Sequence, residues 1–472
     1  MQLANHKWKS YLIGDRSFYK TVFAIVVPII IQNLITSFVG LLDNIMVGQL
    51  GTAQMSGVAI ANQLIFIFNI CIFGGTSGAS IYGAQFYGAG DYEGMRACMR
   101  VKLYIAIGIF VILGTAFLLF DDQLISMFLQ SGDSPEVVAA TLNAGKDYLF
   151  VMIIGLLPFT IAMSYSSTLR EAGETMLPMV SGVVAVFTNM ALNYVLIFGK
   201  LGFPEMGVVG AAVATVISRY VEMFIIVFWS HVNRVKYHYL RGVYSTLKVP
   251  VQLVKRIAVR GTPLLANEAL WSVGMSFLNQ LYSVAGIDVV AATNIAGTVS
   301  NLFNTVAFAM GNAVAIMVGQ ALGADEIERA KKSAWRLIAF GVMSAVTMGI
   351  LLAGASPFIP LIYKTEQSVR SLSTSFMLIL ALAMPLTAFA HCCYFTLRSG
   401  GKTIMTFIFD CMSIWLINVP VVYVCVHHTG LSIEWTYLFS QLTNLIKCIF
   451  GAILVWKGVW IHNITVETRK EA

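Results

Sequence analysis

The chain has 472 residues, of which 58% are hydrophobic and only 11% charged, and its mean hydropathy is +0.78. This composition excludes an ordinary soluble domain and predicts a protein whose solvent is largely lipid. The net charge of +7 does not indicate a nucleic-acid partner, because the basic residues lie in short stretches between apolar segments.

Apolar segments follow one another along the whole chain. A helix needs about 20 mainly apolar residues to span a hydrocarbon core about 30 Å thick. The apolar runs are continuous and do not alternate as the strands of a membrane barrel do, so they predict helices. We expect an all-α integral membrane protein with twelve transmembrane helices, at residues 23–46, 57–83, 101–120, 147–169, 177–198, 207–229, 261–284, 290–319, 335–354, 373–397, 404–426 and 433–456.

Basic residues gather on one side of these helices. Lys7, Lys9, Arg16 and Lys20 precede the first helix, and most of the others follow even-numbered helices. The exceptions are four in the opposite loops and two within helices, namely Lys146, Lys200, Lys364, Arg370, Arg219 and Lys447. Basic loops remain cytoplasmic in multi-pass proteins. Both termini are therefore predicted to be cytoplasmic, and the protein to lie in a plasma membrane or bacterial inner membrane.

The seven cysteines lie mostly within the predicted helices and show no CxxC spacing. This pattern indicates neither a disulfide framework nor a zinc site. We expect no resident cofactor.

The two halves of the chain repeat each other. The segment that begins VPIIIQNL matches one that begins TPLLANEA at an offset of 235, which pairs Pro28 with Pro263 and Gln85 with Gln320. Later the offset is 228, where TLREAGET (168–175) meets TLRSGGKT (396–403). Internal repeats of this kind are common in transporters.

Six helices per repeat is an even number, so both copies enter the membrane from the same side. The two lobes are then related by an axis along the membrane normal, with a cavity between them. The predicted organisation is an N-terminal lobe at 1–229, a basic cytoplasmic linker at 230–260 and a C-terminal lobe at 261–472.

Several strings resemble the multidrug and toxin extrusion (MATE) family, in particular its bacterial DinF-like side. They are Pro28 and Asp43 followed by MVGQLG (46–51), LREAGETMLP (169–178), NMALNYVLIFG (189–199) and GAAVATVISR (210–219). The resemblance covers nearly the whole chain. It implies an H⁺- or Na⁺-driven exporter of small organic compounds, often cationic or amphipathic, that works by alternating access between two six-helix lobes.

Asp43 is the first candidate for a coupling residue, because an ionisable group inside a span is costly unless it faces a cavity, a partner or an ion. Counting residues along the helices places Asn189, Asn193 and Thr215 at the same depth, in the outer half of the membrane. A carboxylate beside amide and hydroxyl oxygens can hold Na⁺, or the carboxyl can bind a proton. The resemblance implies the same four-residue site. Since some family members carry Asp where this chain has Asn193, H⁺ is favoured, and hydrogen bonding between helices is the structural alternative.

The sequence contains two further candidate features. Pro28, in the inner part of the first helix, removes a backbone hydrogen bond and predicts a kink. In the second lobe, four charged or titratable residues are predicted to meet about 10–13 Å from the cytoplasmic ends of their helices. They are Glu268, His391, Asp410 and Lys447. They could form a second functional cluster, or an ion-pair network that only holds the lobe together. Arg219 is expected to pair with Glu222.

Two other functions compete with export. A flippase for lipid-linked saccharides or peptidoglycan precursors would need basic residues facing the cavity, and only Arg219 and Lys447 are intramembrane bases. A membrane-embedded enzyme would need clustered acids or histidines, but His427 and His428 have no acidic neighbours in sequence. We therefore expect a transporter and not an enzyme, acting as a monomer in the bilayer on small-molecule substrates, with no nucleic-acid partner.

Overall fold

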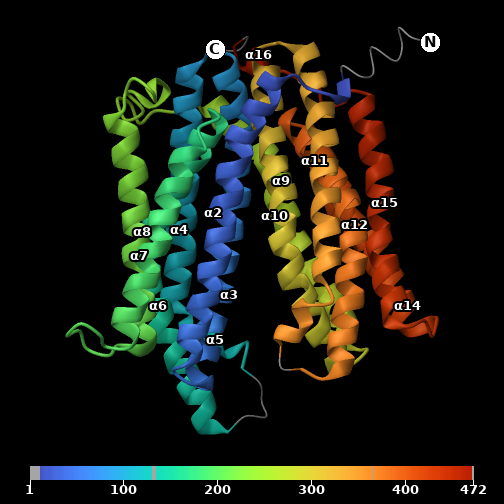
Figure 1. Cartoon of the computed structure of the whole chain (residues 1–472). Coiled ribbons are helices and arrows are strands. Elements are labelled where there is room, and N and C mark those ends of the chain that lie inside the picture. The colour runs from blue at the N-terminus through green and yellow to red at the C-terminus, as the bar shows by residue number, and fades with distance from the viewer. Residues whose placement is uncertain (1–10, 130–133, 364, 470–472) are drawn as a thin grey trace. The chain divides into compact units, whose positions relative to one another are not determined.

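The computed structural model describes residues 11–129, 134–363 and 365–469, and within these ranges it is helical, with no strand. Lys7, Lys9 and Lys364 lie outside them. The long helices (Figure 1) are α2 (Arg16–Gly48), α3 (Thr52–Gly88), α4 (Tyr92–Leu119), α6 (Pro135–Glu171), α7 (Met176–Ile197), α8 (Gly207–Val232), α9 (Val251–Ser283), α10 (Ile287–Gly323), α11 (Ile327–Ala355), α12 (Gln367–Ser399), the continuous segment Thr403–His428 that ends in α14 (Val419–His428), and α15 (Ile433–Trp456).

Each of the twelve predicted spans falls on one of these helices, so the all-α membrane fold is confirmed. Among the described residues, eleven helices are long and apolar enough to cross a membrane by composition. The remaining long helix is α9, whose first ten residues include Lys255, Arg256 and Arg260.

Several helices begin well before their predicted starts. α4 begins at Tyr92 and α6 at Pro135, whereas the apolar segments suggested 101 and 147. Hydropathy detects only the part of a helix that lies in hydrocarbon, while the backbone stays helical beyond it. At the start of α6, extended Ser134 and the fixed φ of Pro135 favour a helix N-terminus.

The duplicated TLR strings end two helices in the same way. After α6, Gly173 has φ +83°, and the N–H of Glu174 donates to the carbonyl of Leu169 at 2.9 Å. After α12, Gly401 has φ +72°, and the N–H of Lys402 donates to the carbonyl of Leu397 at 3.4 Å. This is a Schellman-type C-cap, which needs a residue in the left-handed region. The sequence repeat is therefore also a repeat of local structure.

Contacts divide the chain into two compact units. Unit 1 comprises the described parts of Met1–Ile30, Ala84–Asp91 and Arg256–Ala472, and unit 2 comprises Ile31–Gly83 and Tyr92–Lys255. The division passes through α2 two residues after Pro28, and through α3 near its end. The predicted lobes at 1–229 and 261–472, with the linker at 230–260, describe the repeat and stay a prediction.

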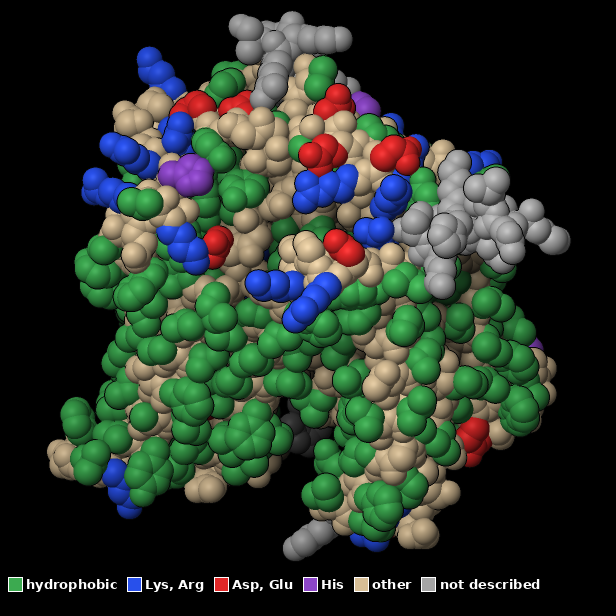
Figure 2. All heavy atoms as spheres, turned by 45° about the horizontal axis from the view of Figure 1, so that its top comes forward, with side chains coloured by type: hydrophobic (Ala, Val, Ile, Leu, Met, Phe, Trp, Pro, Cys, Tyr) green, Lys and Arg blue, Asp and Glu red, His purple; other side chains and the backbone are tan. Residues whose placement is uncertain are grey.

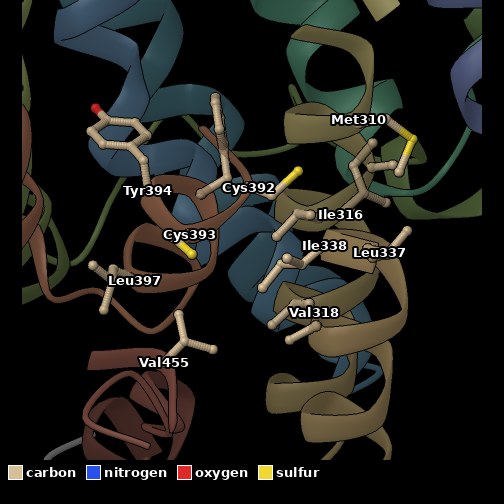
Figure 3. Packing of buried hydrophobic residues seen from close by; sticks show 14 of the residues in the cluster. Met310, Ile316, Val318, Leu337, Ile338, Cys392, Cys393, Tyr394, Leu397 and Val455 are labelled. Carbon is tan, nitrogen blue, oxygen red and sulfur yellow. The ribbon is translucent and has the colours of Figure 1, made fainter. Parts of the chain in front are cut away.

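One apolar core of unit 1 lies between α2, α10, α11, α12 and α15, and Figure 3 shows part of it. Cys392 and Cys393 on α12 lie in it as fully buried thiols, together with Leu337 of α11 and Met310 of α10. Buried free thiols pack as small apolar groups. The core of unit 2 contains residues of α3, α6 and α7, such as Phe68, Leu149 and Ile197.

The surface separates charged from apolar side chains. Figure 2 shows charged side chains gathered at one end of the helices, above flanks covered by hydrophobic side chains. Large apolar residues on these flanks are exposed, among them Phe150, Phe224 and Ile350. Such a surface is stable only against lipid, so the chain is a multi-pass membrane protein.

Candidate functional site

The four N-terminal site residues form one cluster in unit 2. α2 carries Asp43, α7 carries Asn189 and Asn193 one turn apart, and α8 carries Thr215. The side-chain amide of Asn193 donates to Oδ1 of Asp43 at 2.7 Å. The same nitrogen lies 3.2 Å from Oδ1 of Asn189, whose other terminal atom lies 3.0 Å from Oγ1 of Thr215. The structure thus brings together the residues that helix counting placed at one depth.

The amide of Asn189 has two chemically distinct orientations. In one, its nitrogen donates to Thr215 and its oxygen faces the carboxylate of Asp43. In the other, its nitrogen donates to Oδ2 of Asp43 at 2.9 Å and its oxygen accepts from Thr215 at 3.0 Å. An ionised carboxylate and an amide oxygen are both acceptors and cannot face each other at 2.9 Å. An ionised Asp43 therefore requires the second orientation, whereas a protonated Asp43 can donate to the Asn189 oxygen in the first.

The cluster is partly closed to solvent. Asn189 and Asn193 are 6% and 1% exposed, whereas Asp43 and Thr215 are half-buried. Oδ1 of Asn193 is buried without a hydrogen-bond partner among the described residues. One carboxylate thus faces amides held by neighbouring helices, and it is not fully enclosed by them.

Tyr148 on α6 is a neighbour of this cluster that the sequence did not indicate. It interacts electrostatically with Asp43, and its hydroxyl donates to Oδ1 of Asn62 on α3 at 3.4 Å. Tyr148 is 6% exposed. A tyrosine inside an apolar helix carries no distinguishing signal, because most such residues only pack.

The cluster offers a single titratable group. No set of three or more His, Cys, Asp or Glu side chains that could hold a metal occurs in the described ranges. Na⁺ would have to be bound by one carboxylate with amide and hydroxyl oxygens. A proton needs only the carboxyl and a partner for each protonation state, which Asn189 supplies.

Arg219 pairs with Glu222 as predicted, with Nη1 and Oε2 3.2 Å apart. Its guanidinium also lies over the ring of Phe159, 4.9 Å from the centroid. The charge of this intramembrane base is therefore balanced within α8. Pro28 lies inside α2, which continues as a helix on both sides of it.

In unit 1, Asp410 and Lys447 meet. Nζ of Lys447 lies 2.8 Å from Oδ1 of Asp410, and the amide of Asn267 on α9 donates to Oδ2 at 3.1 Å. Both side chains of the pair are mostly buried, with exposures of 14% for Lys447 and 22% for Asp410. Asn267 is a member of the cluster that sequence analysis missed, although it directly precedes Glu268.

The other two predicted members of this cluster, His391 and Glu268, do not take part in the ion pair. His391 and Glu268 both interact electrostatically with Asp410, but neither forms a hydrogen bond or ion pair with it. His391 instead packs between aromatic rings, with Phe308 at 5.2 Å and Phe395 at 4.9 Å between centroids. The cluster is thus an ion pair with a hydrogen-bonded amide, flanked by an imidazole and a second carboxylate.

The backbone around Asp410 departs from the α-helix. Ile408–Met412 and Ile414–Asn418 form π-helical turns, and Pro420 follows in the first turn of α14. Proline has no N–H and its ring clashes with the carbonyl four residues earlier, which disfavours α-helical bonding there. π-Helical turns are rare and often occur at functional sites. Here the first of the two turns contains Asp410.

A buried ion pair in unit 2 was also missed. Lys102 on α4 is fully buried, and its Nζ lies 2.5 Å from Oε1 of Glu171 and 3.1 Å from the hydroxyl of Thr168. Ser167 donates to the same carboxylate at 2.8 Å. The pair lies where α4 and α6 adjoin, and the predicted start of the third helix at 101 had left Lys102 at a helix end.

Comparisons with known proteins agree with this architecture. The MatE family model matches residues 28–195 and 263–424, which is one match in each half of the repeat. The chain is 28% identical over 458 residues to the probable multidrug resistance protein NorM of Thermotoga maritima, covering 96% of both chains. It is 26% identical to the probable multidrug resistance protein YoeA of Bacillus subtilis, over 93% of this chain and 95% of that one.

Solved structures share the fold. A MOP superfamily transporter from Pyrococcus furiosus matches with a TM-score of 0.83 at 22% identity, covering 96% of this chain and 97% of that one. The Vibrio cholerae MATE transporter VcmN matches with a TM-score of 0.84 at 17% identity, over 95% and 98% of the two chains. The family model matches more than half of the chain and both halves of the repeat, and the chain therefore belongs to the MatE family of membrane transporters.

Proposed function

We propose that this protein is a multidrug exporter that exchanges small organic compounds, often cationic or amphipathic, for protons by alternating access between its two lobes. Relatives that align along almost the whole chain are named probable multidrug resistance proteins. The observation that carries proton coupling is the contact between Asp43 and the Asn189 amide.

The coupling step uses the two orientations of Asn189. An ionised Asp43 accepts from the amides of Asn189 and Asn193, and that arrangement turns the oxygen of Asn189 toward Thr215. A protonated Asp43 donates to the oxygen of Asn189, whose nitrogen then donates to Thr215. Proton binding therefore changes the hydrogen bonds that join α2, α7 and α8. We propose that α2 bends near Pro28 in response, because a helix lacks one backbone bond at proline.

Na⁺ is the second candidate for the coupling ion. The unpartnered oxygen of Asn193 supports it, since a cation could be bound by that atom together with Asp43 and Thr215. The single carboxylate and the donor nitrogen of Asn193 at 2.7 Å favour the proton. In unit 1 we propose that Asp410 and Lys447 form a structural ion pair, with Glu268 and His391 available to a substrate or a second ion.

The flippase alternative is disfavoured by the ion pairs that the intramembrane bases Arg219 and Lys447 form. Arg219 is paired with Glu222 and Lys447 with Asp410, so neither charge is uncompensated. A pyrophosphate group would have to compete with these carboxylates. We further propose that the protein acts as a monomer in the plasma membrane, with both termini cytoplasmic, and binds neither nucleic acid nor a resident cofactor.

The test is transport in proteoliposomes with H⁺ and Na⁺ gradients imposed separately, against a panel of cationic dyes and drugs. We expect a pH gradient to drive export by the wild type and Asp43→Asn to abolish it. The matched control is Asp288→Asn, which removes an exposed acid in the first turn of α10. Unchanged pH-driven export by folded Asp43→Asn would refute the coupling role, and transport driven only by Na⁺ would replace the proton.

A further inference from the structure

The segment that joins α8 to α9 lies at one end of unit 2 (Figure 1). It encloses a small cavity together with the end of α8. Its volume is about 190 Å³, and its lining lies between Ser230 and Ser245. Pockets for drug-sized ligands measure about 300–1,000 Å³. The cavity therefore suits a small group and not a transported drug.

The lining is basic. His231, Arg234 and Arg241 contribute to it together with the hydroxyls of Tyr244 and Ser245, and no acidic residue lines it. Neither arginine forms an ion pair with a carboxylate in the described ranges. Arginine combined with hydroxyl donors is the usual chemistry of phosphate recognition.

Nearby acids are already engaged. Glu174 lies 2.7 Å from Nζ of Lys236. Glu93 binds Arg96 at 2.8 Å and Arg100 at 2.9 Å. The positive charge at the cavity is therefore not balanced by these carboxylates.

The backbone of the segment is held by one face of α4. Arg96 donates to the carbonyl of Arg241 at 2.8 Å, Arg100 to that of Val243 at 2.7 Å, and Tyr104 to that of Leu247 at 2.5 Å. These three donors are spaced one helical turn apart. The walls of the cavity are thus fixed in advance, which lowers the entropic cost of binding.

Hydrogen bonds also order the inner wall. The hydroxyl of Tyr165 lies 2.8 Å from Nε2 of His231 and 2.6 Å from the hydroxyl of Tyr244. Tyr165 of α6 thereby links the side chains of His231 and Tyr244.

The segment and its flanking helix ends also carry large apolar side chains that are exposed. Trp229 is 53% exposed, Leu247 68%, Val251 80% and Val235 94%. A segment in water would bury such residues, whereas a segment in the headgroup layer inserts them among acyl chains. Tryptophan is enriched at that depth. The exposed apolar residues therefore favour the phosphate of a lipid, and not a soluble phosphate, as the ligand of the cavity.

We propose that this cavity binds the phosphate of an anionic phospholipid, with Arg234 and Arg241 as its cationic ligands and the acyl chains beside the exposed apolar residues. Basic pockets on the cytoplasmic side of membrane helices bind lipid headgroups in this way. The proposal does not depend on which ion or compound is transported.

The test measures lipid binding to the detergent-purified full chain by native mass spectrometry, with phosphatidylglycerol and phosphatidylcholine as probes. We expect a preference for phosphatidylglycerol. Each arginine near the surface contributes about fivefold, so Arg241→Gln should weaken binding about fivefold and Arg234→Gln/Arg241→Gln about 25-fold. The control is Arg16→Gln/Lys20→Gln, which removes two exposed charges from α2.

Two further experiments locate the binding site and show whether the bound phosphate belongs to a lipid. A photoactivatable phosphatidylglycerol should cross-link to residues 228–251, and millimolar inorganic phosphate should not displace it. Equal affinity of wild type and Arg241→Gln would overturn the proposal, and so would displacement by inorganic phosphate with the same arginine dependence. Arg241→Gln keeps the test decisive if the double variant misfolds, because only the backbone of Arg241 is hydrogen-bonded among the described residues.

Discussion

Gln85 and Gln320 occupy equivalent positions in the two halves, 235 residues apart, and the backbone carbonyl of each lies against the glycine three residues beyond the other. A Cβ on Gly88 would overlap the carbonyl of Gln320, and a Cβ on Gly323 would overlap that of Gln85. Within unit 1, the ends of α3 and α10 therefore pack together through matching residues of the repeat.

This reciprocal packing predicts the effect of alanine at either glycine. Gly88→Ala and Gly323→Ala should each lower the free energy of unfolding by about 1–3 kcal/mol, because backbone atoms must move apart. The measurement is thermal unfolding of the purified protein in detergent. Gly297→Ala on α10 is the control, since a Cβ there meets nothing within 4 Å and should be neutral or slightly stabilising. Equal effects at Gly323 and Gly297 would contradict the packing.

Gln85 also fixes the segment that follows α15. Its Nε2 donates to the carbonyls of Ser399 and His462, at 2.8 and 3.1 Å, and its Oε1 accepts from the N–H of Ile464 at 2.9 Å. Gln85→Leu should destabilise by about 1–3 kcal/mol for each buried group left without a partner. Hydrogen exchange should then accelerate in residues 458–465 before the rest of unit 1. Gln63→Leu, at an exposed position of α3, should leave this exchange unchanged.

The pair of Asp410 and Lys447 can be tested by a double-mutant cycle. Asp410→Asn or Lys447→Met alone leaves a mostly buried charge unpaired and should cost about 3–5 kcal/mol. The double variant should recover part of that loss, because no lone charge remains. The free energies of unfolding of the four proteins give the coupling. Additive losses would show that the ion pair contributes no stability. Export by a stable double variant would assign the pair a structural role.

Much of the fold could be predicted because the hydrocarbon core imposes a strong constraint. Continuous apolar runs located every long helix, and the positions of Asp43, Asn189, Asn193 and Thr215 followed from the regular rise of a helix. Depth alone was enough for this cluster, because α7 and α8 are uninterrupted α-helices through Asn189, Asn193 and Thr215.

The second cluster was predicted less completely because depth does not give rotation or local geometry. His391 and Glu268 interact electrostatically with Asp410, yet His391 packs between Phe308 and Phe395. Of the predicted members, only Lys447 pairs directly with Asp410. The π-helical turns before Pro420 change the angular positions of the residues around Asp410, which counting at 100° per residue cannot anticipate.

Asn193 provides the sharpest test of ion preference. Asn193→Asp would place a second carboxyl where the amide now donates to Asp43 at 2.7 Å. Two carboxylates so close cannot both ionise without a cation between them, so the variant should either share one proton or bind Na⁺. We expect Na⁺ gradients to drive export by Asn193→Asp at least tenfold better than by the wild type, and pH-driven export to decline. Asn193→Ser serves as the control, because it shortens the side chain without adding charge. If Na⁺ drives wild type and Asn193→Asp equally well, the number of carboxylates does not set the coupling ion.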